Sequence, residues 1–158
     1  MEPKVSPQEA YALAQEGHPL VDVRSVAEYE AGHPPGAWNI PWIHMDRGES
    51  EVNSRFFELF EHCFPDRRAK IILFCQSGRR SHEAAMALRA RGYEALFEMP
   101  AGWGGRRDAF GRLIERGWEA EGLPIERGPS ERGWSKILFR KDHGLAAEEA
   151  DKEAEKRH

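Results

Sequence analysis

Short, largely apolar runs recur along the first two thirds of the chain. They cover residues 20–23, 37–40, 71–74 and 95–97, and polar residues, glycine or proline stand between them. Runs of this length are typical of strands that are buried in a sheet. Amphipathic stretches separate the runs. Strands that alternate with helices predict an α/β fold, with a parallel sheet and helices on both of its faces.

Helix-start signals lie between these runs. Ser6 and Ser25 are each followed three positions later by a glutamate, Glu9 and Glu28. A serine that caps a helix and a glutamate that reaches back to it form a capping box, so a helix is expected to begin after each serine. Gly17 ends the first of these helices. Further helices are expected at 53–64 with Asn53 as the cap, at 80–91 and at 110–118, whereas 42–52 is expected to be a polar connection.

The composition predicts one soluble domain with a tail. At 158 residues and 40% apolar content, the chain is long enough for one domain and too short for two of ordinary size. It contains no run of about 18 apolar residues, so no membrane span is predicted. Its start has neither a basic nor an apolar leader region, which predicts a cytoplasmic location. The net charge of −4 gives no general attraction to nucleic acid.

Cys63 and Cys75 are the only cysteines of the chain. They do not form a C-x-x-C pair, and no cluster of cysteine and histidine has the spacing of a zinc site, so neither a metal nor another cofactor is predicted. Both thiols are expected to stay reduced in the cytoplasm. Cys63 lies within the largely apolar stretch 56–64, which favours a place in the hydrophobic core.

Cys75 directly follows the run 71–74 and directly precedes Gln76-Ser77-Gly78-Arg79-Arg80-Ser81, from which a helix is expected. At the end of a buried strand, the amides of a turn and of a helix N-terminus point at one spot and stabilise an anion. Such surroundings, with arginines nearby, lower the pKa of a thiol from about 8.5 to between about 3.5 and 7.5. We therefore expect Cys75 to be a nucleophile, with a buried and inert cysteine as the alternative.

Two blocks of the sequence together resemble the rhodanese (sulfurtransferase) family. The first block contains Asp22-Val23-Arg24, Glu28-Tyr29 and Gly32-His33-Pro34-Pro35-Gly36-Ala37-Trp38-Asn39-Ile40-Pro41, similar to D-x-R, E-[FY] and G-H-[IP]-x-G-A-x-N-I-P. The second block, 75–81, is similar to the family's C-x-S-G-x-R-S active-site loop. Residues 117–124 are similar to its G-W-x-x-x-G-L-P terminus. The resemblance covers about residues 5–127, the predicted rhodanese domain, and leaves 128–158 as a C-terminal extension of no assigned structure.

The resemblance implies about five parallel strands and one catalytic residue, Cys75, which carries a persulfide. The implied activity is that of a thiosulfate sulfurtransferase, which moves a sulfane sulfur from a small anionic donor such as thiosulfate to cyanide or a thiol. The residues expected to bind substrate are Gln76, Ser77, Gly78, Arg79, Arg80 and Ser81. Arg79 and Arg80 would supply positive charge, and Gly78 would let the loop turn its amides inward. Ser81 fits either a hydroxyl donor or a simple helix-cap residue.

Four residues outside this loop are assigned supporting places. Asp22 and Arg24 follow a strand, at the edge where α/β sheets carry their sites, and we expect them to pair and to fix the loop beneath Cys75. His33 and Trp103 are placed at the rim of the pocket, with packing and hydrogen bonding as the alternative for each. The arginine-rich segment 100–117 either overhangs the site or is an idle surface insertion.

Two other functions stay open. A phosphatase or arsenate reductase also holds a cysteine in a cradle of amides, but phosphatases of this geometry need a longer loop. Four residues separate Cys75 from Arg80, and Ser81 stands where the arginine would be required. A docking or persulfide-sensing module without catalysis is the other alternative. Thiosulfate, a persulfide, glutathione, thioredoxin and a sulfur-carrier protein all fit as donor or acceptor, whereas neither nucleic acid nor a membrane is expected as a partner.

Overall fold

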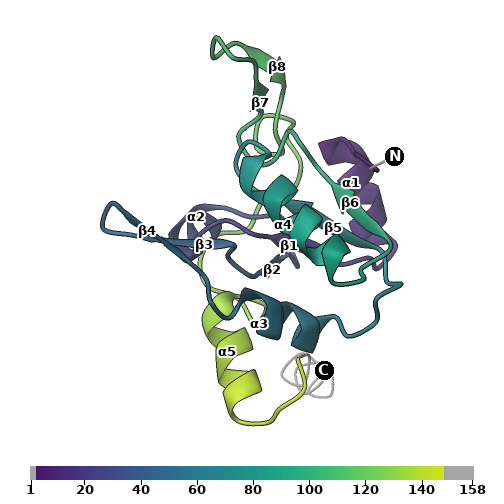
Figure 1. Ribbon diagram of the computed structural model, residues 1–158. Helices are drawn as coiled ribbons and strands as arrows, with labels where there is room; N and C mark the ends of the chain where they lie inside the picture. Colours follow the sequence, from purple (N-terminus) through teal and green to yellow (C-terminus); the bar gives the residue numbers. More distant parts are fainter. Residues whose placement is uncertain (1–2, 148–158) are drawn as a thin grey trace.

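The computed structural model describes residues 3–147, and a parallel sheet of four strands runs through its centre (Figure 1). The elements in chain order are α1 (Pro7–Gln15), β1 (Leu20–Asp22), α2 (Val26–Ala31), β2 (Trp38–Asn39), β3 (Ile43–Asp46), β4 (Glu49–Val52), α3 (Phe56–Cys63), β5 (Ile71–Phe74), α4 (Arg79–Ala90), β6 (Leu96–Glu98), β7 (Arg106–Arg107), β8 (Leu113–Glu115) and α5 (Trp134–Asp142). The central sheet has the order β2-β1-β5-β6, and all of its pairs are parallel. A single parallel bridge between Lys4 and Glu98 adds to its outer edge beyond β6. The predicted α/β fold is confirmed.

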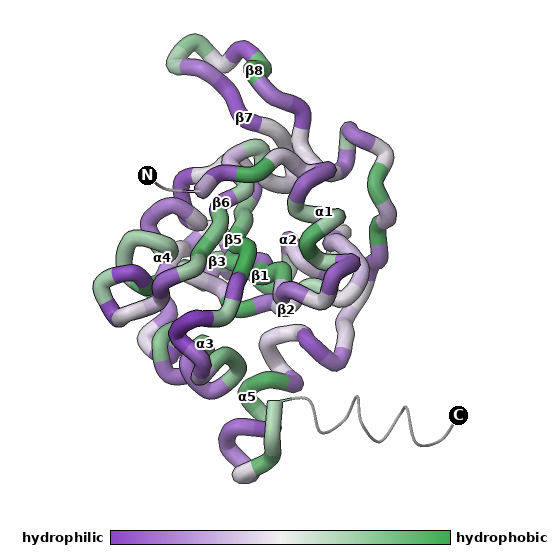
Figure 2. The backbone as a smooth tube through the Cα atoms, turned by 90° about the vertical axis from the view of Figure 1, so that its right-hand side faces the viewer, coloured by the Kyte–Doolittle hydropathy of each residue, from purple (hydrophilic) through white to green (hydrophobic). Residues whose placement is uncertain are grey.

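The central strand β5 is buried on both faces of the sheet. Ile71 and Leu73 belong to the hydrophobic cluster beneath α3, α4 and α5, whereas Ile72 and Phe74 belong to the cluster beneath α1 and α2. Figure 2 shows these strands as hydrophobic segments in the middle of the molecule. Since side chains alternate along a strand, a continuous apolar run is what helices on both faces require.

Both predicted capping boxes are confirmed. Ser6 Oγ accepts the N–H of Glu9 at 3.1 Å, and Glu9 Oε1 accepts the N–H of Ser6 at 2.9 Å. Ser25 and Glu28 exchange the same two bonds at the start of α2. These local bonds satisfy amides that a helix terminus leaves without partners, which is why the sequence pattern locates both helix starts.

Asn53 does not cap α3, contrary to the expectation from the sequence. Its Oδ1 accepts the N–H of Arg55 at 3.0 Å, and its Nδ2 donates to the carbonyl of Pro41 at 2.8 Å. The helix begins at Phe56, after this turn. Asn53 therefore ties the chain before α3 back to the segment that follows β2.

Two segments form antiparallel hairpins that the sequence did not predict. The expected polar connection 42–52 contains β3 and β4, whose turn residues Arg47 and Gly48 have φ values of 52° and 79°. Two successive positive φ angles suit a tight two-residue hairpin turn. The helix expected at 110–118 is also wrong, because Leu113–Glu115 is strand β8, paired with β7.

The turn between β7 and β8 explains why that helix does not form. Asp108 Oδ1 accepts the N–H groups of Phe110 at 2.8 Å and of Arg112 at 2.9 Å. Gly111 between them has a φ of 79°. An aspartate that binds nearby amides competes with the helical hydrogen-bond pattern, and a glycine at positive φ ends it.

The C-terminal extension contributes α5 to the hydrophobic core. Trp134 and Ile137 belong to the same cluster as the buried face of α3, and Figure 1 shows α5 beside α3. The segment before α5 is also bound to the domain, since Arg132 O accepts the N–H of Asn39 at 2.9 Å. Residues 148–158, the charged end of this extension, lie outside the described residues. None of the described helices has the length and apolar character that a membrane span requires.

The substitution Ile137→Ala tests how much α5 stabilises the domain. Ile137 is 1% exposed, so removing its side chain leaves a cavity and should lower the free energy of unfolding by about 2–4 kcal/mol. Urea unfolding followed by circular dichroism measures the loss. Phe139→Ala is the matched control on the outer face of α5, where Phe139 is 53% exposed, and should cost less than about 1 kcal/mol. Equal losses in both variants would contradict the packing of α5.

Candidate active site

Cys75 lies at the carboxyl end of the central strand β5, on the turn that leads into α4. Gly78 forms the N-terminal cap of α4 with a φ of 103°, a backbone region that side chains other than glycine adopt at a cost. A Cβ at this position would also lie 2.8 Å from the carbonyl oxygen of Pro100. Glycine is therefore required both for the turn and for the segment that packs behind it.

Two backbone amides point at the sulfur of Cys75. The N–H of Gly78 donates to Cys75 Sγ at 3.1 Å, and the N–H of Ser81 does so at 3.4 Å. The hydroxyl oxygen of Ser81 also lies 3.4 Å from the sulfur. Cys75 is 1% exposed. Because a buried anion is stable only where donors replace water, this arrangement suits a negatively charged sulfur at the positive end of α4.

The segment 100–104 braces the turn from behind. The N–H of Trp103 donates to the carbonyl of Cys75 at 2.9 Å, and the N–H of Gly104 donates to the carbonyl of Gln76 at 2.9 Å. Gly102 has a φ of 61°, and a Cβ there would lie 2.3 Å from the carbonyl oxygen of Cys75. The two carbonyls point away from the sulfur into these bonds, which leaves the amides of the loop free to face it.

Asp22 and Arg24 form a buried pair next to this brace. Arg24 Nη2 donates to Asp22 Oδ2 at 2.7 Å and to the carbonyl of Gly32 at 2.7 Å. The guanidinium carbon of Arg24 lies 4.9 Å from the centre of the Trp103 ring. Through Trp103, whose amide binds the carbonyl of Cys75, the pair contacts the base of the loop.

Arg80 is held by Glu28 from the start of α2. Its Nη1 and Nη2 donate to the two carboxylate oxygens at 2.7 and 3.0 Å. Burial opposes ionisation of Glu28, but the hydrogen bonds and charge of Arg80, with those of Ser25, outweigh it and lower the pKa of Glu28 to about 2. Hydrogen bonding to Glu28 raises the pKa of Arg80 against the effect of burial, and the charge of Cys75 adds a smaller increase. Arg80 is thus a fixed positive charge within the electrostatic range of Cys75.

The remaining residues of the predicted loop face outward or bind its backbone. The side chain of Arg79 is 90% exposed and lies 3.5 Å from Glu83, one turn further along α4. Ser77 is exposed, and Gln76 is partly buried against Gly104. The structure therefore places Gly78 and Ser81 around the sulfur of Cys75, whereas the side chain of Arg79 points to solvent.

Among residues 3–147, no hydrogen bond or ion pair joins His33 to Cys75 or to the loop 76–81. Its Nδ1 lies 2.7 Å from the carbonyl of Tyr29, and the two rings stack at 3.7 Å. Its backbone pairs with Glu126 near the end of the predicted domain. Trp103, the other residue assigned to the rim, is 6% exposed and belongs to the brace behind the loop. Both side chains pack within the domain.

Two contributions to the site have no direct signal in the sequence. The sequence predicts Glu28 only as the capping-box partner of Ser25. Its second role, holding Arg80, depends on how α2 and α4 pack together. Gly102 belongs to a glycine-rich stretch, and this composition is the only sign of a close backbone approach. Among residues 3–147, no group of three or more histidine, cysteine, aspartate or glutamate side chains could hold a metal ion.

The fold and the loop agree with comparisons to known proteins. A family model for the Rhodanese-like domain matches residues 6–106, so the chain belongs to the rhodanese-like family. Thiosulfate sulfurtransferase 16, chloroplastic, of Arabidopsis thaliana is 30% identical over a match that covers 77% of this chain and 91% of that protein. Thiosulfate sulfurtransferase GlpE of Haemophilus influenzae (strain PittEE) is 30% identical, with 65% and 85% covered. The crystal structure of Rv0390 from M. tuberculosis is 28% identical with a TM-score of 0.62, and the match covers 79% of this chain and 97% of that one.

Gly102→Ala tests the brace behind the loop. The new methyl group would collide with the carbonyl of Cys75, so we expect a loss of more than about 2 kcal/mol in the free energy of unfolding. Gly17→Ala is the matched control: Gly17 has a φ of 99° with nothing within 4 Å of the added carbon, and it should lose only about 1 kcal/mol from backbone strain. Urea unfolding of both variants measures the difference. Similar losses would show that the close approach is unimportant.

Glu28→Gln tests the contact with Arg80 through its pH dependence. The pKa of Glu28 is lowered from 4.5 to about 2 in the folded protein, so ionised Glu28 stabilises the fold above about pH 4.5, and this contribution is lost as the pH falls through about 2. At pH 7 the variant should be less stable by about 1–3 kcal/mol. Urea unfolding at several pH values should show the two proteins converging near pH 2. A constant difference down to pH 2 would contradict the assignment, and the exposed Glu30→Gln serves as control.

Proposed function

We propose that the protein is a thiosulfate sulfurtransferase of the rhodanese type, in which Cys75 carries the transferred sulfur as a persulfide. The observation that supports the proposal most directly is the pair of amides, from Gly78 and Ser81, that donate to Cys75 Sγ. Donors fixed in this way stabilise negative charge on a sulfur without having to reorganise during the reaction. Relatives named thiosulfate sulfurtransferase support the same activity.

In the first step, the thiolate of Cys75 attacks the outer sulfur of thiosulfate. A bond forms between Cys75 Sγ and that sulfur, the sulfur–sulfur bond of thiosulfate breaks, and its electron pair leaves with sulfite. Cys75 becomes a persulfide anion with the same single negative charge that the thiolate had. The loop amides then serve the persulfide as they served the thiolate, because the charge stays in the same cradle.

In the second step, an acceptor attacks the outer sulfur of the persulfide. With cyanide, a carbon–sulfur bond forms, the sulfur–sulfur bond breaks, and its electron pair returns to Cys75 Sγ. Thiocyanate leaves, and the free cysteine is restored. In this scheme Arg80 offsets the negative charge of the loop in both steps, and Glu28 holds its guanidinium in place.

Arg79 is proposed as the residue that meets the donor anion before it enters the loop. Its side chain, four positions after Cys75, is 90% exposed, and among residues 3–147 its ion pair is a 3.5 Å contact with Glu83 on the same helix. Such an exposed pair contributes little to stability and is easily exchanged for an anionic ligand. The substrate-binding roles of Gln76 and Ser77 rest on the resemblance of the loop and are proposed with it.

Treatment with thiosulfate followed by intact-protein mass spectrometry tests the persulfide. The wild type should gain one sulfur atom and lose it again on addition of cyanide, because Cys75 accepts and releases the sulfur in separate steps. Cys75→Ser should gain none and should transfer sulfur at least about 10³-fold more slowly. The matched control Cys63→Ser removes the other thiol and should behave as the wild type does. A wild type that gains no sulfur would contradict the enzyme and favour a docking module without catalysis.

Initial-rate kinetics test the order of the two steps. Because the donor product must leave before the acceptor reacts, plots for varied thiosulfate at several cyanide concentrations should be parallel. Intersecting plots would mean that both substrates bind at once and that no free persulfide enzyme forms.

A further inference from the structure

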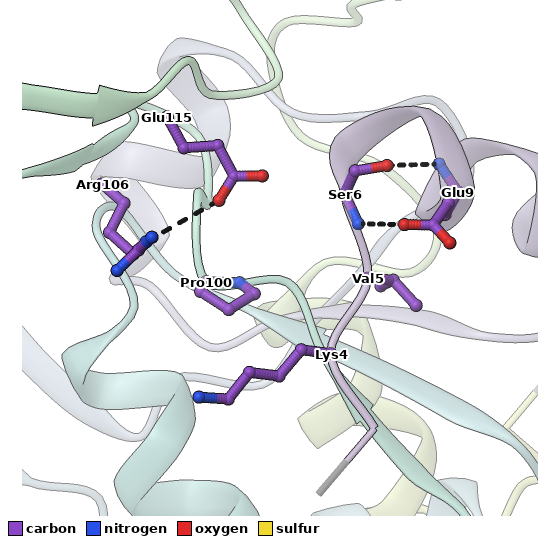
Figure 3. A pocket seen from close by; sticks show the side chains of 7 residues that line it. All are labelled: Lys4, Val5, Ser6, Glu9, Pro100, Arg106 and Glu115. Carbon is purple, nitrogen blue, oxygen red and sulfur yellow. Dashed lines mark hydrogen bonds and ion pairs between the residues drawn. The ribbon is translucent and has the colours of Figure 1, made fainter.

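The hairpin of β7 and β8 stands out from the body of the domain. Figure 1 shows it rising above the end of the sheet where α4 begins, with only its base joined to the rest of the chain. The ion pair of Arg106 with Glu115, at 3.7 Å, closes this base. A cavity of about 350 Å³ separates the hairpin from the start of α1 (Figure 3). Its lining residues are Lys4, Val5, Ser6, Glu9, Pro100, Arg106 and Glu115. The hairpin thus extends into solvent above the cavity.

The base of this hairpin continues directly from the brace of the active-site loop. Gly104, which donates to the carbonyl of Gln76, is followed by Gly105 and then by β7. A Cβ at Gly105 would lie 2.7 Å from the Leu113 side chain and 2.9 Å from the carbonyl of Glu115. Close packing at Gly105 therefore holds the two strands together, and the hydrogen bond of Gly104 joins their base to the loop that carries Cys75. A molecule bound to the hairpin would be held beside that loop.

The hairpin is basic, although the chain as a whole has a net charge of −4. Residues 106–116 contain four arginines and two carboxylates. Among the residues that the structure describes, Arg107, Arg112 and Arg116 have no carboxylate within ion-pair distance. Arg107 and Arg116 instead donate to the carbonyls of Gly111 and Ala120. Guanidinium groups without a charged partner are suited to bind carboxylates of another molecule.

Apolar side chains are exposed among these arginines. Phe110, at the turn, is 86% exposed, and Leu113 and Ile114 on β8 are about half exposed. Figure 2 shows the same mixture, with hydrophobic colours at the turn and on β8 within a hydrophilic hairpin. Arg112 lies beside the Phe110 ring, 5.9 Å from its centre. Aromatic and arginine side chains are the types enriched at the centre of protein interfaces.

We propose that this hairpin, residues 105–116, docks an acidic protein that brings the thiol which accepts sulfur from Cys75. The inference rests on the proposed sulfurtransferase function and names the partner of that reaction. A lipid surface fits less well, because the carboxylate of Asp108 forms the turn beside Phe110 and would have to enter the membrane with it. Charge complementarity would speed the encounter with an acidic protein, and the apolar residues would hold it.

The transfer to this partner balances without an added oxidant. The acceptor thiol, as its thiolate, attacks the outer sulfur of the Cys75 persulfide and forms a new sulfur–sulfur bond. The bond to Cys75 Sγ breaks, and its electron pair stays on Cys75. The partner leaves as a persulfide, and Cys75 is ready for the next donor.

A matched pair of peptide thiols tests the proposal with the full-length protein. Both peptides carry one cysteine and two leucines, one with several glutamates and the other with lysines in their place. Rapid quenching and mass spectrometry follow the loss of sulfur from persulfidated Cys75. The charge reversal Arg107→Glu with Arg112→Glu should slow transfer to the acidic peptide at least about tenfold and should not slow transfer to the basic one. Comparing each peptide with itself across variants removes differences in thiol reactivity between the peptides.

Three controls keep the outcome specific. Arg68→Glu with Lys70→Glu makes the same change in charge just before β5, at the opposite end of that strand from Cys75, and should alter each rate less than about twofold. Arg107→Gln with Arg112→Gln keeps hydrogen-bond donors and should give an intermediate rate. Phe110→Ser, which removes an exposed ring, should slow transfer to both peptides, since both carry leucines.

Transfer to cyanide separates this proposal from the proposed function. Every hairpin variant should pass sulfur to cyanide at the wild-type rate, because cyanide needs no docking. If the wild type passes sulfur to cyanide but the charge reversal leaves the acidic peptide unaffected, docking by the hairpin is wrong and the sulfurtransferase activity stands. If the wild type passes sulfur neither to cyanide nor to the acidic peptide, the proposed function itself fails. Binding to vesicles of phosphatidylserine without discrimination between the peptides would favour a lipid surface and overturn the protein partner.

Discussion

The hydrogen bonds from the amides of Gly78 and Ser81 to Cys75 Sγ are the contacts on which the rest of the site depends. Cys75 is 1% exposed, so its sulfur has almost no water to stabilise a negative charge. The amides take the place of water, and the start of α4 adds its partial positive charge. They can do so because Gly78 adopts a positive φ and because the carbonyls of the loop are turned the other way.

The bonds that turn those carbonyls come from parts of the chain far from Cys75. The amides of Trp103 and Gly104 bind the carbonyls of Cys75 and Gln76, and Arg24 packs against the ring of Trp103. On the other side, Glu28 from α2 fixes Arg80. The loop is therefore held by the ends of several elements at one edge of the parallel sheet, the arrangement by which α/β folds position functional groups.

Local chemistry explains which features could be predicted from the sequence. The capping boxes of Ser6 and Ser25, the buried run 71–74 and the turn at Gly78 each depend on residues within a few positions, and the structure has an element at each. The two hairpins cannot be predicted in this way, because the local pattern in their strands is weak. Of their strands only β3 alternates apolar and polar residues, and it does so over four positions alone. The other three are short, largely exposed and without that alternation, which marks a half-buried strand. The roles of Glu28, Gly102 and α5 depend on tertiary contacts that no local pattern records.

A crystal structure determined after treatment with thiosulfate would test the central claim most directly. If the loop amides form the cradle for transferred sulfur, additional electron density should extend from Cys75 Sγ, with its outer sulfur within hydrogen-bond distance of amides of the turn between β5 and α4. The bonds from Trp103 and Gly104 to the loop carbonyls should be unchanged. An unmodified Cys75, or a sulfur bound to Cys63 instead, would contradict the account.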